Sequence, residues 1–154
     1  LLTKNALDLD SKNKVEIALK SSQHLLSLIN DILDYSKLEN GNETLDVIEF
    51  NLEDELNSIY EFLKPLANQK NIHLSWVGIG NLPSFIESDP FKLRQIILNL
   101  ISNALKFTPE NGKVSFSYKQ TKGNSIEFEI QDNGIGISQE IIPSLFQSFY
   151  QADQ

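Results

Sequence analysis

The sequence predicts an α+β fold, a two-layer α/β sandwich in which helices cover one face of a mixed sheet. Apolar residues recur at three- and four-residue steps in residues 51–66 and 89–107, as they do in helices with one buried face. Apolar and polar residues alternate in residues 72–76, 114–118 and 126–130, which is typical of half-buried strands. Because each helix has a single apolar face, packing both helices on one side of the sheet buries those faces together. The other side of the sheet is expected to stay partly exposed to water.

The composition limits the class of protein and its partners. The chain has 154 residues, enough for one core-bearing domain with a modest extension. The contents of apolar residues (40%) and charged residues (22%) are ordinary for a soluble globular protein, and a net charge of −8 argues against nucleic acid and anionic membranes as partners. No apolar run approaches the roughly 20 residues of a membrane-spanning helix. The absence of cysteine is compatible with the cytoplasm, and the absence of methionine indicates a piece of a longer protein.

A long helix is predicted over residues 14–38, after a polar turn at residues 8–13 and before Gly41, a residue common just past helix ends. Its wide apolar face comprises Val15, Leu19, Leu25, Leu26, Ile29, Ile32, Leu33 and Leu38. An isolated helix of this length would leave that face in water, so it needs a partner, either its own domain or a second helix. We therefore divide the chain into a helical region, residues 1–41, and an α/β domain, residues 45–154.

The α/β domain is expected to begin with an edge strand, Leu45–Phe50. Asn51 followed by Asp54 then starts a helix, because this pair can satisfy free backbone N–H groups and complement the positive end of the helix dipole. The apolar stripe of this helix comprises Leu52, Leu56, Ile59, Phe62, Leu63 and Leu66. A short strand, Ser84–Glu87, leads into the next helix, and the Gly-Asn pair at 123–124 predicts a hairpin between the last two strands.

The central helix is predicted to begin after Asp89, whose carboxylate can cap it. Pro90 then occupies the first helical position, where its missing N–H costs nothing. The stripe that faces the core comprises Leu93, Ile97, Leu100, Ile101 and Ala104. Thr108 and Pro109 end the helix just after Lys106.

Three polar residues, Asn99, Asn103 and Lys106, lie on the opposite side of this helix. One interpretation is an ordinary exposed face, which is polar by default. The other is a phosphate site, since an asparagine amide oxygen can share a magnesium ion with phosphate oxygens and a lysine can contact phosphate directly. These three residues alone leave both interpretations open.

A glycine-containing loop follows the last predicted strand. Asp132 comes directly after the strand, and Gly134 and Gly136 let a ligand approach the backbone without interference from a Cβ atom. Most loops with such a glycine pair are turns, so the pair by itself is weak evidence for a binding site.

Two motifs, taken together, resemble those of the two-component sensor histidine kinases. The stretch NLISNALKFT, residues 99–108, is similar to their N box, and DNGIGI, residues 132–137, is similar to their first glycine box. Residues 24–41, HLLSLINDILDYSKLENG, resemble the second helix of their dimerisation and phosphotransfer region. Residues 145–153, LFQSFYQAD, resemble the F box. The resemblance covers essentially the whole chain and implies that the long helix, part of a dimeric helical-hairpin bundle, precedes the sandwich.

The resemblance implies a site for ATP and Mg²⁺. In the family's pattern Asn103 is the magnesium ligand, while Asn99 and Lys106 lie beside the phosphates. Asp132 accepts a hydrogen bond from the exocyclic amine of adenine, which selects adenine over guanine. The other residues implied to bind the nucleotide or line its pocket are Phe107, Gly134, Gly136, Ile137 and Phe149.

The resemblance also implies an activity and partners. The parent protein would transfer the γ-phosphoryl group of ATP to a histidine of the dimerisation region, for relay to an aspartate of a response-regulator receiver domain. Residues 14–38 would form a homodimer, and this chain would lie in the cytoplasm, attached in some parents to an inner-membrane sensor. Gyrase-like relatives carry a water-activating glutamate where this chain has Asn99, so phosphoryl transfer is favoured over hydrolysis.

Parts of the family's pattern have no match in the chain. Nothing in residues 1–13 matches the H box that carries the phosphoacceptor histidine. His24 lacks an adjacent carboxylate that would serve as a base, and His73 alternates with apolar residues as on the polar face of a strand, so neither is expected to replace it. The F-box aromatics Phe146, Phe149 and Tyr150 would anchor the ATP lid or form core beside it. The second glycine box would follow Asp153.

We therefore expect the chain to be inactive alone and to bind ATP more weakly than a complete domain. The alternative function, from a different class, is a non-enzymatic dimeric interaction module or a degenerate kinase fragment. The presence of all the N-box and glycine-box residues argues against degeneracy of the parent.

Overall fold

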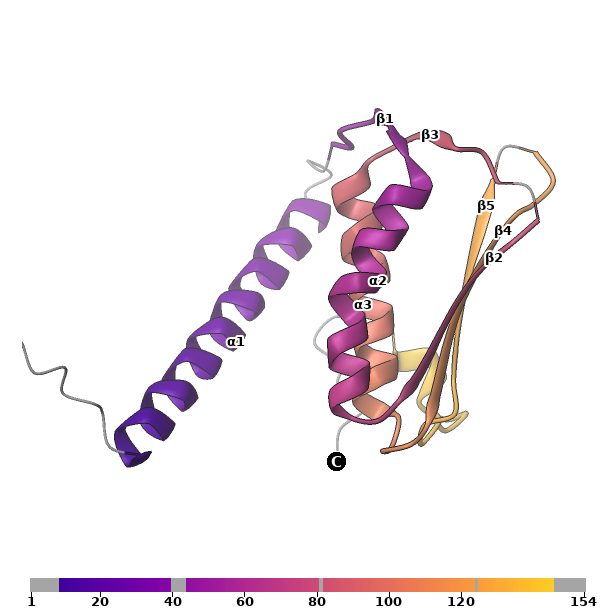
Figure 1. Ribbon diagram of the computed structural model, residues 1–154. Helices are drawn as coiled ribbons and strands as arrows, with labels where there is room; N and C mark the ends of the chain where they lie inside the picture. The colour runs from indigo at the N-terminus through magenta and orange to yellow at the C-terminus, as the bar shows by residue number, and fades with distance from the viewer. Residues whose placement is uncertain (1–8, 40–43, 81, 124, 146–154) are drawn as a thin grey trace, which may run out of the picture. The chain divides into compact units, whose positions relative to one another are not determined.

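The computed structural model describes residues 9–39, 44–80, 82–123 and 125–145 (Figure 1). The chain divides into two compact units, Leu1–Thr44 and Leu45–Gln154. The first unit is helical and the second contains all the described strands. Each unit is described by itself below.

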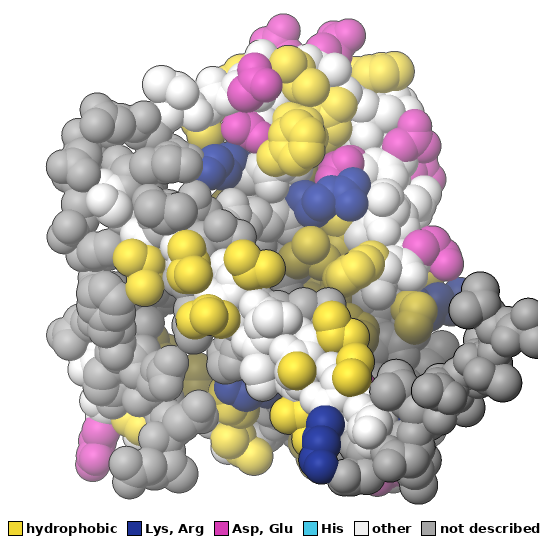
Figure 2. Space-filling model, turned by 90° about the vertical axis from the view of Figure 1, so that its left-hand side faces the viewer, with side chains coloured by type: hydrophobic (Ala, Val, Ile, Leu, Met, Phe, Trp, Pro, Cys, Tyr) yellow, Lys and Arg dark blue, Asp and Glu magenta, His cyan; other side chains and the backbone are white. Residues whose placement is uncertain are grey.

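The described residues of the first unit form α1 (Leu9–Glu39), a helix of 31 residues. It begins earlier than expected, because the polar stretch at its start forms helix rather than the predicted turn; acidic and hydroxyl residues suit the first turn of a helix as well as a turn. Its exposed apolar residues include Val15, Ile17, Leu19, Leu25, Leu26, Ile29 and Ile32. Figure 2 shows one face of the molecule, with hydrophobic side chains exposed near its centre. The apolar face of this helix is therefore not covered within its own unit.

The second unit is a two-layer sandwich, as the sequence predicts. Its elements, in order, are β1 (Ile48–Asn51), α2 (Leu52–Gln69), β2 (His73–Ile79), β3 (Phe85–Ser88), α3 (Pro90–Phe107), β4 (Lys113–Gln120), β5 (Ile126–Asp132) and a 3₁₀ turn, Ile142–Ser144. The main sheet has the order β2-β4-β5, with β2 and β4 parallel and β4 and β5 antiparallel, so it is mixed. Strands β1 and β3 form a separate antiparallel pair. Helices α2 and α3 lie side by side on one face of the main sheet (Figure 1).

Helix starts follow the local sequence as predicted. The Asp89 Oδ1 atom accepts a hydrogen bond from the Lys92 N–H at 3.0 Å, and Pro90 begins α3. The Asn51 Oδ1 atom accepts from the Asp54 N–H at 3.1 Å and caps α2. These side-chain oxygens satisfy N–H groups that have no partner inside the helix.

The core lies between the two helices and the sheet. Its fully buried side chains are Leu52, Leu56, Ile59, Leu63, Ile97, Ile101, Val114 and Phe116. The Trp76 ring lies 4.2 Å from that of Phe116 and 5.4 Å from that of Tyr60, between centroids, so Trp76 is part of the aromatic core.

Three residues predicted to be buried are instead exposed. Phe62 is 61% exposed, Leu66 is 44% exposed and Leu100 is 52% exposed. All three lie at the margins of their apolar stripes, and the sheet covers only the centre of each stripe. Periodicity identifies the side of a helix that is apolar but does not measure how wide the contact with the sheet is.

Candidate functional site

The polar side of α3 is exposed, as predicted. Asn99, Asn103 and Lys106 are all exposed, while Ile97 and Ile101 on the other side of the helix are buried. The Lys106 Nζ atom lies 4.7 Å from the centroid of the Phe107 ring, so the ammonium lies beside this aromatic ring at the end of the helix. The carboxyl-terminal half of α3 thus presents two amides and a cation to solvent.

The loop after β5 lies directly against the carboxyl-terminal end of α3. The Ile135 N–H donates to the Phe107 carbonyl oxygen at 3.3 Å. Gly134 approaches the same carbonyl so closely that a Cβ atom on this residue would lie 2.6 Å from the Phe107 oxygen. Glycine is therefore required at position 134 for steric reasons. We call this contact between residue 107 and residues 134–135 the helix–loop junction.

Asp132 ends β5 and begins this loop. Its Oδ1 atom accepts a hydrogen bond from the Gly134 N–H at 2.8 Å, which fixes the carboxylate relative to the loop. The side chain is exposed. Because side chains alternate along a strand, Asp132 belongs to the same side of β5 as Phe128 and Ile130, which pack against the core beneath the helices.

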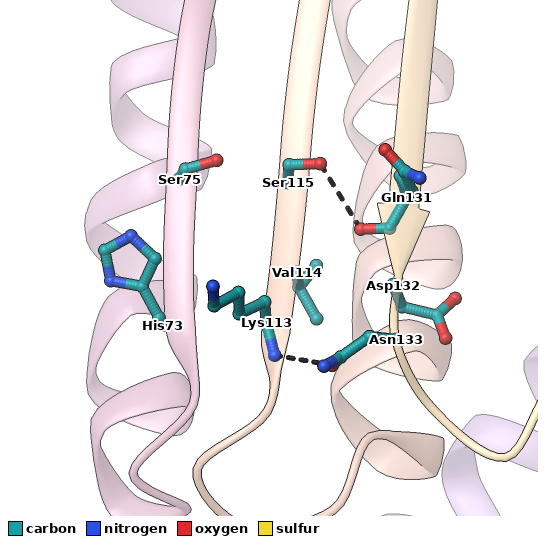
Figure 3. A pocket seen from close by; sticks show the side chains of 8 residues that line it. All are labelled: His73, Ser75, Lys113, Val114, Ser115, Gln131, Asp132 and Asn133. Atoms are coloured by element: carbon teal, nitrogen blue, oxygen red, sulfur yellow. Dashed lines mark hydrogen bonds between the residues drawn. The ribbon is translucent and has the colours of Figure 1, made fainter.

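Asn133 attaches the loop to the neighbouring strand. Its Oδ1 atom accepts from the Lys113 N–H at 2.7 Å, and its own N–H donates to the Lys113 carbonyl oxygen at 3.2 Å. Figure 3 shows the side-chain bond between β4 and the end of β5. This reciprocal pair fixes the backbone directly after Asp132.

The remaining glycine-box residues are exposed. Gly136 has a φ of 70°, a conformation that favours glycine, and nothing lies within 4 Å of the position its Cβ would occupy. Ile137 is also exposed. Phe146, Phe149 and Tyr150 lie outside the described residues.

A cavity of about 420 Å³ lies beside this site and is shown in Figure 3. It is lined by His73, Ser75, Lys113, Val114, Ser115, Gln131, Asp132 and Asn133. Most of these residues belong to the sheet face that is not covered by helices, which agrees with the expected position of His73 on the polar side of its strand. The cavity includes Asp132 but not Asn103, so it is not itself a pocket that joins the two motifs.

The residues present fit a nucleoside triphosphate with a divalent cation. Gly136 leaves the loop backbone open to a ligand, since nothing lies within 4 Å of the position its Cβ would occupy, and the Asp132 carboxylate and the Asn103 amide are exposed. The Thr108 hydroxyl, at the end of α3, is buried and has no hydrogen-bond partner among the described residues. A buried polar group without a partner is costly unless a ligand or water completes it.

Sequence reasoning missed three contributors to this site. In the sequence, Asn133 is only part of a motif, Thr108 only ends a helix, and no pattern marks Lys70. The Lys70 Nζ atom donates to the carbonyl oxygens of Leu105 at 2.8 Å and Lys106 at 3.0 Å. No local pattern in the sequence signals these contacts, because they join segments more than thirty residues apart.

The described residues contain neither a cluster of metal ligands nor a membrane-spanning helix. Within residues 9–39, 44–80, 82–123 and 125–145, no group of three or more His, Cys, Asp and Glu side chains is arranged to hold a metal ion. No helix among those residues combines the length and apolar character needed to cross a membrane.

Comparison with known proteins identifies the class to which this fold and site belong. Residues 88–154 match the family described as histidine kinase-, DNA gyrase B- and HSP90-like ATPases. The sensor protein GacS of Pseudomonas syringae pv. syringae is 42% identical over 137 residues, which is 87% of this chain and 15% of GacS. The chain thus spans about a sixth of the length of this relative.

Solved structures agree with this assignment. Full-length ShkA in complex with AMPPNP is 32% identical, with a TM-score of 0.75, over 88% of this chain and 29% of that one. The histidine kinase ThkA in complex with the response regulator TrrA shares the fold, with a TM-score of 0.72 at 21% identity, over 96% of this chain and 42% of that one. Residues 88–154 thus belong to the histidine kinase-, DNA gyrase B- and HSP90-like ATPases, and the chain is similar to sensor histidine kinases over most of its length.

Proposed function

We propose that this chain binds Mg·ATP at the helix–loop junction, and that its parent transfers the γ-phosphoryl group to a histidine for relay to a receiver aspartate. The observation that carries the proposal is the bond from Ile135 N–H to the Phe107 carbonyl oxygen. This bond joins the helix that carries Asn103 and Lys106 to the loop that carries Asp132. Adenine recognition and phosphate binding require groups from two separate segments of the chain, and this junction connects those segments.

Each group has a definite task in the proposal. The Asp132 carboxylate accepts a hydrogen bond from the exocyclic amine of adenine; guanine carries a carbonyl at that place and would leave the carboxylate unpaired. The Asn103 amide oxygen ligates Mg²⁺ together with phosphate oxygens, and Lys106 contacts phosphate. Phe107, Gly134, Gly136 and Ile137 are the other proposed contacts of the nucleotide, and Phe149 is assigned by the resemblance alone.

Phosphoryl transfer rather than hydrolysis follows from Asn99. An amide has no useful basicity, so it cannot activate water as a carboxylate does. Catalysis by this chain's residues would then consist of positioning the nucleotide and neutralising its charge. Rapid release of inorganic phosphate by the chain, abolished in Asn99→Ala, would contradict this part of the proposal.

The nucleotide site is tested by calorimetric titration of the 154-residue chain with Mg²⁺ and non-hydrolysable analogues of ATP and GTP. The wild-type chain should bind the ATP analogue and discriminate against the GTP analogue. Asp132→Asn should weaken binding of the ATP analogue about tenfold or more, because the charged acceptor for the adenine amine is lost. Glu129→Gln, which removes one negative charge from the same strand, is the matched control and should bind normally. Normal binding by Asp132→Asn would remove that residue from the site.

We further propose that α1 mediates homodimerisation through residues 14–38. The exposed apolar side chains of this helix, among them Leu25 and Ile29, would be covered by a second copy. Light scattering should give the mass of a dimer, and Leu25→Glu should reduce it to that of a monomer. A monomeric wild-type chain would contradict this assignment.

A receiver domain of a response regulator is the proposed partner, because ThkA was solved in complex with the response regulator TrrA. We place this part of the protein in the cytoplasm, where ATP is available. The exposed face of α1 also supports the second candidate function, a non-enzymatic dimeric interaction module. Dimerisation without any nucleotide binding in the titration would favour that alternative.

A further inference from the structure

The last turn of α3 has backbone carbonyls that the helix itself cannot satisfy. In an α-helix the carbonyl of each residue accepts a hydrogen bond from the N–H of the residue four positions later, so the last four carbonyls have no partner within the helix. The Leu105 carbonyl would require the N–H of residue 109, which is Pro109 and has none. The sequence at the end of this helix therefore leaves Leu105, a buried residue, dependent on a donor from elsewhere.

Lys70 supplies that donor from a different helix. It lies at the carboxyl-terminal cap of α2, and its Nζ atom lies 2.8 Å from the Leu105 oxygen and 3.0 Å from the Lys106 oxygen. A positive charge at the carboxyl-terminal end of a helix also interacts favourably with the helix dipole. One ammonium group thus satisfies two consecutive carbonyls of α3.

The next carbonyl of the same turn faces the glycine loop. The Phe107 oxygen accepts from the Ile135 N–H at 3.3 Å. Lys70 and Ile135 therefore hold adjacent parts of one helical turn, the first from α2 and the second from the loop after β5. Any movement of this turn would change the helix–loop junction and the position of Lys106 together.

The backbone around Lys70 is itself well fixed. Asn71 has a φ of 54°, and the Ile72 N–H donates to the Ala67 carbonyl at 2.9 Å, which ends α2 tightly. The Asn71 side chain donates to Glu110 at 2.8 Å, and the His73 N–H donates to the Gly112 carbonyl at 2.9 Å. The chain between α2 and β2 is therefore attached to the end of α3 and the connection after it at three places, counting Lys70 and His73.

We propose that Lys70 is a positioning residue for nucleotide binding: its ammonium fixes the last turn of α3 against the glycine loop. This inference rests on the proposed function. Lys70 has no assigned contact with the nucleotide and acts through the backbone of residues 105–107. If it served stability alone, its loss would lower the unfolding temperature but leave the affinity of the folded protein for nucleotide unchanged.

The test compares Lys70→Met with Lys64→Met in the 154-residue chain. Both substitutions remove one positive charge from α2 and keep a long side chain. Lys64 is exposed, and its Nζ atom lies 3.9 Å from a Glu61 oxygen and 5.4 Å from the centroid of the Tyr60 ring, both within α2. The dissociation constant for a non-hydrolysable ATP analogue with Mg²⁺ is measured at a temperature at which both variants are folded.

Lys70→Met should weaken binding about tenfold, as expected for loss of a charge-assisted bond that orders the site, and Lys70→Arg should restore most of it. Amide hydrogen exchange at Ile135 should accelerate about tenfold in Lys70→Met without nucleotide, because its acceptor is no longer fixed. Lys64→Met should change neither quantity by more than about twofold.

Each outcome is decisive. Two results in Lys70→Met would together overturn the inference: a dissociation constant within about twofold of wild type, and an Ile135 amide exchange rate within about twofold of wild type. They would leave the proposed function intact. If the wild-type chain itself fails to bind the analogue, the proposed function fails and the inference fails with it. Should Lys70→Met not fold, Lys70→Gln, which also removes the positive charge, is measured by the same two criteria.

Discussion

Gly134→Ala tests the helix–loop junction most directly, because the obstacle to a side chain at this position can be measured. A Cβ atom would lie 2.6 Å from the Phe107 oxygen, 2.8 Å from the Asp132 Oδ1 atom and 3.0 Å from the Phe107 carbonyl carbon. Ordinary contact begins at 3.4 Å, so loop and helix must separate by about 0.8 Å. No flexible side-chain end can relieve this overlap at the carbonyl, since Phe107 contributes backbone atoms there.

That separation exceeds what the neighbouring hydrogen bond can tolerate. The bond between the Ile135 N–H and the Phe107 oxygen is already 3.3 Å long, so it would be lost. Loss of the bond contributes about 0.5–1.5 kcal/mol, and the overlap itself about 1–3 kcal/mol. We expect Gly134→Ala to lower the free energy of unfolding by about 2–4 kcal/mol and to weaken binding of the ATP analogue at least about tenfold.

Urea unfolding and calorimetric titration measure the two effects separately. Gly123→Ala, in the hairpin between β4 and β5, is the control for general destabilisation. Its φ of 83° makes alanine strained, but nothing lies within 4 Å, so only about 1–2 kcal/mol should be lost and nucleotide affinity should not change. Wild-type affinity in Gly134→Ala would refute the argument that this junction forms the nucleotide site.

Two further predictions concern the framework that holds α3. The hydrogen bond from the Lys92 N–H lowers the pKa of the Asp89 carboxyl below its ordinary value of 3.8. The ionised carboxylate therefore stabilises the folded protein fully above pH 3.8, and this stabilisation is lost as the pH falls through the lowered pKa. In Asp89→Asn the free energy of unfolding should therefore decline less steeply below about pH 4 than in the wild type. Acid titration followed by circular dichroism measures this, and an unchanged slope of unfolding free energy against pH would contradict it. Arg94 binds Glu55 through two bonds of 2.7 and 3.0 Å, and Glu55 is only 15% exposed, so Arg94→Ala should cost about 1–2 kcal/mol in urea unfolding. Lys119→Ala, which breaks the exposed ion pair with Glu127, should lower the free energy of unfolding by less than about 0.5 kcal/mol. Equal losses in Lys119→Ala and Arg94→Ala would show that the geometry of the Arg94 pair adds no stability.

Local features of the chain could be predicted because their causes are local. Asp89 followed by Pro90 begins a helix whatever surrounds it, since the cap and the fixed φ act within one turn. The strands at 114–118 and 126–130 follow from alternation, and the glycine hairpin between them fixes their antiparallel pairing. The resemblance of the N box and the glycine box indicated which residues to place together before any contact was known.

The sequence by itself determined the fold class, the starts of the two sandwich helices and the residue types of the candidate site. Only the tertiary structure decided that Phe62, Leu66 and Leu100 are exposed, because the width of a buried stripe depends on the surface that covers it. It also decided which donors complete the end of α3. Because residue 109 is proline, the sequence shows that the Leu105 carbonyl lacks its helical partner. It does not show that Lys70 supplies the donor, since hydrogen bonds between distant segments depend on how the chain folds back on itself.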